Sequence, residues 1–148
     1  MKVIIDGDAC PVLKIIFKIC DEMNTRCICV HDYCHEIDCG TAEEFVVDKQ
    51  SDSADFKIVS LAEKCDVVIT NDYGLAALCL AKNCIAINFG GKIYDADNID
   101  GLLMRRHIGK KMRRAGKHLK GSPKRSAQED SLFEKSLTKI LSDLYKKL

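Results

Sequence analysis

The chain has 148 residues and a mass of 16.5 kDa; 47% of its residues are hydrophobic, 30% are charged, and the formal net charge is +1. This balance predicts one soluble globular domain with enough apolar surface for a core, and it excludes a disordered chain. No apolar run approaches the ~20 residues of a membrane-spanning helix, and the first run ends at Asp6, too early for a signal peptide.

The cysteines point to a reducing compartment. Nine are present, an odd number, and they are scattered along the chain. Without an export signal, this usage predicts reduced thiols in a cytoplasmic protein and not a disulfide framework. The oligomeric state has no signature in the sequence.

The near-neutral net charge hides a strong asymmetry. Residues 105–127, called the basic segment below, contain ten of the 23 lysines and arginines and no acidic residue, whereas the rest of the chain contains all 22 acidic residues. The basic segment can bind a polyanion such as nucleic acid. Alternatively, it can be a solvated surface whose charges interact with the acidic residues of the same chain. Composition leaves both interpretations open.

Short apolar runs alternate with helical patterns through the first two-thirds of the chain. The runs lack polar alternation and most are separated by a helix, which is typical of a parallel sheet covered on both faces and joined by right-handed crossovers. We therefore expect an α/β fold with a mainly parallel sheet of four or five strands flanked by helices. The predicted strands are 3–5, 27–30, 45–47, 67–69 and 85–87, and the helices begin near residues 11, 53 and 73.

The pattern changes after residue 91. Apolar residues predict a short helix over 99–104, and three glycines and a proline then interrupt the basic segment, which favours a linker. An amphipathic stripe predicts a closing helix over 128–148 that packs on the sheet. We interpret residues 1–148 as a single domain, with an α/β core over 1–104, then the basic segment and the closing helix. The interrupting residues are Gly109, Gly116, Gly121 and Pro123, and the stripe is Leu132, Phe133, Leu137, Ile140, Leu141 and Leu144.

Carboxylates follow two of the predicted strands. Asp6 and Asp8 come directly after the first strand, Asp72 follows the strand at 67–69, and Asp55 lies near the start of a helix. Open parallel sheets bind ligands beyond the carboxyl ends of the strands, where the strand order reverses. If the two strands flank that point, the carboxylates converge and either raise one another's pKa or recruit a cation. Oxygen ligands alone suit Mg²⁺ or Mn²⁺.

Each of these acids also has a local structural explanation. Asp8 and Asp72 can cap the helices that follow them. Asp55 can stabilise its helix from the first turn, where the helix dipole interacts favourably with a negative charge. Asp6 can form an Asx turn at the strand end. The spacing Asp6-Gly7-Asp8 favours a functional role, because a single cap does not explain two acids around a glycine.

Two other groups of residues are weaker candidates for a functional site. Six residues of metal-ligand type lack the paired C-x₂-C spacing of zinc sites, and some lie in a predicted strand, so zinc is not favoured. Cys10 lies near a helix N-terminus, which can lower a thiol pKa, but no histidine is placed to assist it and a packing role is preferred. The six residues are Cys27, Cys29, His31, Cys34, His35 and Cys39.

The segment Asp6-Gly7-Asp8-Ala9-Cys10-Pro11 begins a resemblance that spans nearly the whole chain. The chain resembles the YaiI/YqxD family of uncharacterised bacterial proteins, whose fold is related to PIN nuclease domains. The usual opening of that family is D-A-D-A-C-P, so Gly7 replaces an alanine. Further matches are Ser53-Ala54-Asp55, Asp66 to Asp72, Leu75-Ala76, Gly91, Tyr94, Asn98-Ile99, Arg105-Arg106, Gly121-Ser122-Pro123 and Phe133.

The resemblance implies a three-layer PIN-like fold and a metal-dependent nuclease site of acidic residues. The matching positions are Asp6, Asp8, Asp55 and Asp72. The further acid that PIN domains usually take from a mid-chain helix has no assigned counterpart.

Together these features favour a Mg²⁺- or Mn²⁺-dependent phosphodiesterase acting on RNA or DNA. Asp6, Asp8 and Asp72 would be catalytic, and these three with Asp55 would hold metal or orient the attacking water. The alternatives are a non-catalytic PIN-like protein that binds RNA or other single-stranded nucleic acid, and a haloacid-dehalogenase-type phosphatase with Asp6 as nucleophile and Asp8 as general acid. The residues expected to contact phosphates are Arg105, Arg106, Lys110, Lys111, Arg113 and Arg114.

Overall fold

The structure is a computed structural model that describes residues 1–34, 36–50, 52–118, 120–121 and 123–148. His35, one of the metal-ligand residue types weighed above, and residues 119 and 122 of the expected linker lie outside the described residues. In chain order the elements are β1 Val3–Asp6, α1 Leu13–Glu22, β2 Cys27–Asp32, β3 Glu43–Val47, α2 Ser53–Leu61, β4 Val67–Ile69, α3 Tyr73–Ala81, β5 Ile85–Ile87, β6 Ile93–Tyr94, α4 Ala96–Arg114 and α5 Ala127–Tyr145.

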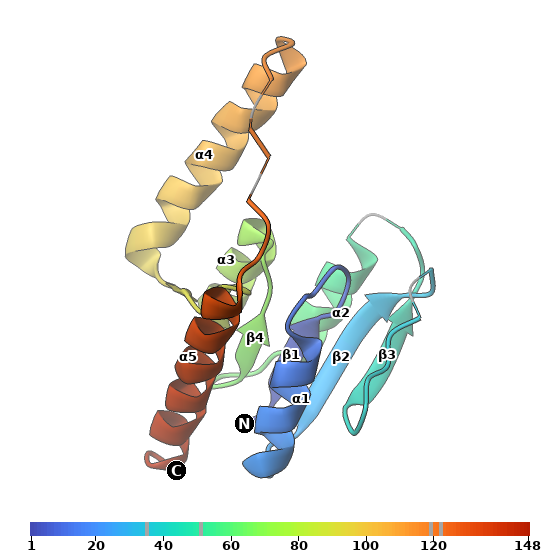
Figure 1. Cartoon of the computed structure of the whole chain (residues 1–148), viewed down its shortest axis with the longest axis vertical. Coiled ribbons are helices and arrows are strands. Elements are labelled where there is room, and N and C mark those ends of the chain that lie inside the picture. The colour runs from blue at the N-terminus through green and yellow to red at the C-terminus, as the bar shows by residue number, and fades with distance from the viewer. Residues whose placement is uncertain (35, 51, 119, 122) are drawn as a thin grey trace.

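The strands form one sheet in the order β3-β2-β1-β4-β5-β6 (Figure 1). Strands β1 to β5 are parallel, and β6 is antiparallel to β5. The chain builds outward from β1 through β2 to β3, returns to place β4 on the other side of β1, and builds outward again to β6. The strand order therefore reverses between β1 and β4, the position at which such sheets bind ligands.

The expected fold class is confirmed: a mainly parallel sheet lies between two layers of helices, and a C-terminal helix closes the domain. Helices α1 and α5 cover one face, and α2 and α3 cover the other (Figure 1). The alternation along β1 explains this arrangement, because Val3 and Ile5 pack with α1 and α5 while Ile4 packs with α2 and α3. All three side chains are fully buried, as in the central strand of a parallel sheet.

The sheet has six strands, one more than the sequence predicts. The additional strand, β6, consists only of Ile93 and Tyr94 and is too short to give a periodic signal. It forms a hairpin with β5, in which Gly91 has a φ of 86°, a left-handed conformation that favours glycine.

Helix α4 differs most from the prediction. It is one helix of 19 residues, not a short helix followed by an interrupted segment. Gly109 lies inside it, and a single glycine in a helix costs only about 1 kcal/mol. A capping box between Asp95 and Asn98 stabilises its start, and three basic residues in its last turn interact favourably with the helix dipole. The first half of the basic segment is therefore helical.

Only the beginning of α4 packs against the rest of the domain. Ile99 is buried, and Leu102 and Leu103 are half-buried against α3. The remainder of the helix stands away from the sheet (Figure 1). The basic residues of α4 are thus presented on a projecting helix.

The closing helix α5 follows the predicted stripe with one exception. A capping box between Ser126 and Glu129 begins the helix. Leu132 is 58% exposed and does not belong to the packed face, contrary to the prediction. Within the described residues, no helix combines the length and the apolar character needed to cross a membrane. The buried side chains of α5 are Phe133, Leu137, Ile140 and Leu141.

Gly7 lies where β1 ends, in close contact with β2. A Cβ atom at this position would lie 2.7 Å from Sγ of Cys29 and 3.1 Å from the carbonyl oxygen of Val30. The N–H of Gly7 donates a hydrogen bond to that same carbonyl at 2.8 Å, which holds the backbone close. The sulfur of Cys29 therefore occupies the space that an alanine methyl would need.

Replacing Gly7 by alanine should lower the free energy of unfolding by about 1–3 kcal/mol, the usual cost of overpacking. The double variant Gly7→Ala, Cys29→Ala should be more stable than the sum of the two single effects predicts, because the new methyl group fills the space of the lost sulfur. Urea denaturation of the four proteins measures this coupling. If the changes in unfolding free energy were additive, contact with Cys29 would not be the reason that this position needs a glycine.

Candidate functional site

The pairing of β1 with β4 brings the predicted acids to one edge of the sheet. Ile5 pairs with Ile69, so Asp6 lies beside Thr70. The Thr70 hydroxyl donates a hydrogen bond to Oδ2 of Asp6 at 2.7 Å and accepts one from the N–H of Asp72 at 3.0 Å. Asp6 is thereby connected through Thr70 to the start of α3, at the point where the strand order reverses.

Asp6 is a carboxyl group in an unfavourable environment for negative charge. Burial raises the pKa of Asp6 to about 6, and the nearby carboxylates of Asp55, Asp8 and Asp72 also raise it, while the hydrogen bond from Thr70 opposes the shift. Burial and like charges both disfavour the ionised form. This edge of the sheet therefore favours either a proton or a cation.

Asp8 connects the loop after β1 to the end of β2. Both of its carboxylate oxygens accept a hydrogen bond from the N–H of Asp32 at 3.2 Å. Helix α1 begins at Leu13 with Val12 in the N-cap position and no side-chain cap. The expectation that Asp8 could cap this helix is therefore wrong. Ala9 follows with a φ of 57°, a left-handed conformation that is uncommon for a non-glycine residue.

Asp72 has the structural role that its position suggested, and an ion pair in addition. Its Oδ1 accepts hydrogen bonds from the N–H groups of Gly74 at 2.8 Å and Leu75 at 3.3 Å, which caps α3. The same oxygen lies 2.9 Å from Nη1 of Arg106 on α4. Burial alone would raise the pKa of Asp72, but the hydrogen bonds from Leu75 and Arg106 outweigh it and lower the pKa.

Asp55 lies in the first turn of α2, as the structural explanation predicted. Burial raises its pKa, the charge of Asp72 raises it further, and Arg106 opposes both. Across the described part of the chain, however, no three of the four acids have oxygens that all lie within 4.8 Å of one another. The edge is a distributed anionic surface and not a closed cage for one ion.

Two residues that the sequence analysis did not assign to the site line the same cleft. Arg125 lies just before α5, and Glu129 lies in its first turn. Nε of Arg125 donates to Asp130 at 2.5 Å, whereas its Nη2 is buried and has no hydrogen-bond partner among the described residues. The cleft is lined by Asp6, Asp8, Asn71, Asp72, Arg125 and Glu129, among others.

A second, larger pocket of about 770 Å³ lies between α2, α3 and α4 and shares Asp72 with the cleft. Asp55 and Asp72 line one part, and Arg106 and Lys110 of α4 line another. Its walls also include exposed apolar side chains, notably Phe56, which is 74% exposed. The pocket therefore combines acidic, basic and aromatic groups beside the acidic edge.

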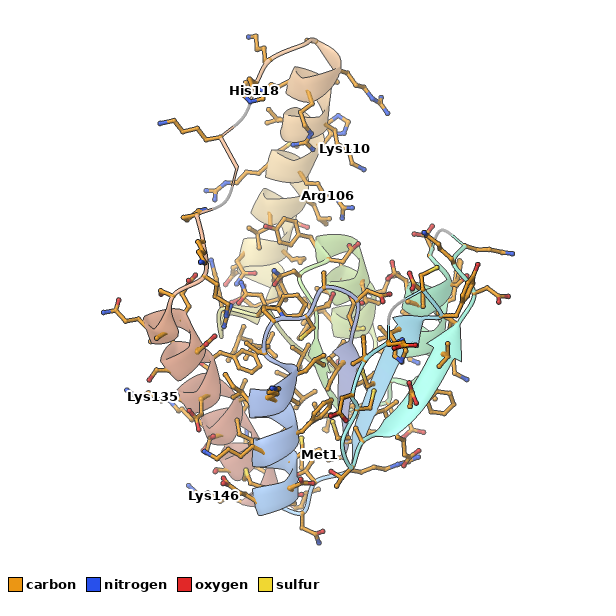
Figure 2. The ribbon with its side chains drawn as sticks, turned by 45° about the vertical axis from the view of Figure 1, so that its right-hand side comes forward. Met1, Arg106, Lys110, His118, Lys135 and Lys146 are labelled. Carbon is orange, nitrogen blue, oxygen red and sulfur yellow. The ribbon has the colours of Figure 1, made fainter. Side chains whose placement is uncertain are left out.

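The six predicted phosphate-contacting residues all lie on α4, and all are exposed. Arg106 and Lys110 lie on the part of the helix that projects from the domain (Figure 2). Cys10, in contrast, is not an activated nucleophile, because burial raises the pKa of its thiol to about 12. The chemistry available at this edge comes from carboxylates and basic groups.

Comparison with known proteins assigns the chain to a family. The family described as "Uncharacterized BCR, YaiI/YqxD family" matches residues 4–143. The chain belongs to this family. It is 43% identical over 143 residues to a UPF0178 protein of Alkaliphilus oremlandii, covering 97% of this chain and 92% of the relative. It is 42% identical over 142 residues to a UPF0178 protein of Natranaerobius thermophilus, covering 95% of this chain and 96% of the relative.

Among solved structures, the crystal structure of a mutant of Rae1 (YacP) from Bacillus subtilis is similar to this YaiI/YqxD protein with a TM-score of 0.47. The two chains are 16% identical in sequence, and the match covers 100% of each.

Asp6 should make the stability of the protein depend on pH. The pKa of Asp6 is about 6 in the folded protein against an ordinary value of 3.8, so the folded state binds its proton more tightly than the unfolded state does. The resulting stabilisation is complete below about pH 4 and is lost as the pH rises through 6. Relative to Asp6→Asn, the wild type should lose roughly 2–3 kcal/mol of unfolding free energy over this range.

Urea denaturation of both proteins between pH 4 and pH 7 checks this difference. Asp6→Asn is the appropriate variant because its amide oxygen can still accept the hydrogen bond from Thr70. Identical pH profiles would mean that the folded protein does not perturb Asp6.

Proposed function

We propose that the protein is a divalent-metal-dependent phosphodiesterase that cleaves RNA, in preference to DNA, in the cytoplasm. The observation that carries the proposal is the acidic edge at the strand-order reversal, directly beside a projecting basic helix. The ion pair between Asp72 and Arg106 marks the contact between the two surfaces. An enzyme that acts on a phosphodiester needs both, because the substrate and the ion have opposite charges.

The donor set fits Mg²⁺ or Mn²⁺. Asp6, Asp8, Asp55 and Asp72 offer only oxygen atoms, which hard cations prefer. Mg²⁺ retains several waters and is usually bound through one or two carboxylates, which agrees with the wide spacing of these acids. Asp6 and Asp72 would hold the ion, and Asp8 and Asp55 would hold a second ion or orient the attacking water. When bound, the ion would polarise the phosphodiester and stabilise the developing charge.

The basic residues would position the substrate backbone. Arg106 lines the pocket beside Asp72, and Arg125 lines the adjoining cleft. Both guanidinium groups could donate hydrogen bonds to phosphate oxygens, Arg125 without giving up its bond to Asp130. The exposed ring of Phe56 offers a surface on which an unpaired base can stack. These features favour single-stranded RNA over a duplex, whose bases are already stacked.

The second candidate function is RNA binding without cleavage. Asp72 is already engaged by the α3 backbone and by Arg106, and among the described residues the acids do not close around a single point. A protein of this kind would use α4 in the same way but would show no turnover. The two functions differ in whether the acidic edge is needed.

Cleavage of single-stranded RNA in the presence of Mn²⁺ should fall roughly 100-fold in Asp72→Asn, which corresponds to about 2.7 kcal/mol of lost transition-state stabilisation. Asparagine at this position can still cap α3, so the variant removes charge with little effect on the fold. The matched control is Asp95→Asn, which makes the same change at the N-cap of α4. Gel analysis of end-labelled RNA measures both.

Equal cleavage by wild type and Asp72→Asn would remove the acidic edge from the mechanism. No cleavage by the wild type across RNAs of varied sequence, combined with salt-sensitive binding, would favour the second function.

RNA binding should depend on the charge of α4. Replacing Lys110, Lys111, Arg113 and Arg114 by glutamine should weaken binding and reduce the slope of log K against log salt concentration by up to about 3, since each phosphate contact to a single strand contributes about 0.7. The control replaces the α5 lysines Lys135 and Lys139, with Lys146 and Lys147 just beyond the helix. Fluorescence anisotropy with a labelled oligonucleotide at several salt concentrations compares them. Binding that survives the α4 changes would exclude this helix as the contact surface.

A further inference from the structure

A second cluster of ligand-type side chains lies between β2, β3 and the loop that joins them. In the parallel pairing of these strands, Cys29 is opposite Glu44 and His31 is opposite Val46. Side chains two residues apart on a strand share a face, so His31 and Glu44 lie on the same face of the sheet. Cys39, from the loop, joins them there. The ligand atoms of His31, Cys39 and Glu44 all lie within 4.8 Å of one another.

We propose that His31, Cys39 and Glu44 bind a transition-metal ion, with Zn²⁺ as the preferred ion and a water molecule as the fourth ligand. A mixed set of nitrogen, sulfur and oxygen suits Zn²⁺, which accepts all three donor types, and is a poor match for Mg²⁺. The site is independent of the proposed nuclease function.

The imidazole of His31 is held in the orientation that a metal ligand requires. Its Nδ1 lies 2.8 Å from the carbonyl oxygen of Asp32. A carbonyl can only accept, so Nδ1 carries a hydrogen and Nε2 faces Glu44, whose Oε1 is 2.7 Å away. Metal-binding histidines characteristically donate their second ring N–H to a carbonyl or carboxylate in this way. The ring is also nearly fully buried, which fixes its position.

The three ligand atoms lie within 4.8 Å of one another, near the spacing that the ion needs. Zinc bonds of about 2.0–2.3 Å in tetrahedral geometry separate the ligand atoms by roughly 3.3–3.8 Å. The side chain of Glu44 is 46% exposed and can rotate to widen its distance from His31. Cys39 is buried, and its thiol lies beside that of Cys29. Small side-chain adjustments, mainly of Glu44, would therefore bring the three ligands to the separation that the ion needs.

An open pocket leads from solvent to this cluster. His31 and Glu44 line it, and Glu36 and Asp38 lie along the same pocket. The acidic residues make the entrance favourable for a cation, and the opening leaves room for the water ligand. Chain spacing does not reveal this site, because one ligand is a glutamate on another strand and the two others are eight residues apart.

The full-length protein, reduced and treated with chelator, should be titrated with Co²⁺, a spectroscopic substitute for Zn²⁺. We expect one equivalent to produce a thiolate-to-cobalt charge-transfer band and the visible bands of a tetrahedral ion, and one equivalent of Zn²⁺ to remove both. Cys39→Ser should lose the charge-transfer band. Cys34→Ser, an exposed cysteine of the same loop, should keep it.

Because His31 is buried and its replacement could prevent folding, Glu44→Gln provides the second test. It should weaken Co²⁺ binding at least about tenfold with an unchanged circular dichroism spectrum. Three results would overturn the proposal: no charge-transfer band in the wild type, a band that persists in Cys39→Ser, or unchanged affinity in Glu44→Gln. A disulfide between Cys29 and Cys39 in the purified protein, with no Co²⁺ uptake after reduction, would instead assign this thiol pair to redox chemistry.

Discussion

The parallel pairing of β1 with β4 is the constraint on which the rest of the structure depends. It places Asp6 beside Thr70, and the Thr70 hydroxyl in turn orients the backbone at Asp72. Both strands are buried on both faces, so a shift of register by one residue would move every side chain of a strand into the opposite core and disrupt its packing against both helix layers. The positions of these two acids are therefore set by hydrophobic packing. The fold thus brings two negative charges together, and the repulsion between them is offset by neighbouring groups.

The compensation comes from α4. Its first turns are anchored on α3 by Ile99 and its neighbours, and this docking brings Arg106 to Asp72. Among the described residues, the other basic residues of the helix form no ion pair, and they are exposed to solvent. A basic segment that served only to balance the acidic body would lie flat against it, whereas this helix projects (Figure 1). The geometry thus favours an external polyanion as the partner of most of these charges.

The sequence predicts the buried strands and the closing helix well, because their apolar runs and stripes encode burial directly. It does not predict the length of α4, because Gly109 and a run of charged residues resemble a linker when no apolar stripe is present. It predicts that acids gather at the strand ends, because topology brings the carboxyl ends of parallel strands together. It does not predict that Arg125 and Glu129 line the acidic edge, because nothing in the chain indicates that the start of α5 lies against the loop after β1.

The backbone of Asp32 connects the two candidate sites. Its N–H holds the carboxylate of Asp8, and its carbonyl accepts the hydrogen bond from the ring of His31. The two donor sets differ in softness, so an ion suited to one is poorly suited to the other. An ion held by His31, Cys39 and Glu44 would not compete for the acidic edge, but it would restrict the peptide that orients Asp8. Coupling between the sites would therefore act through the position of one backbone segment and not through shared ligands.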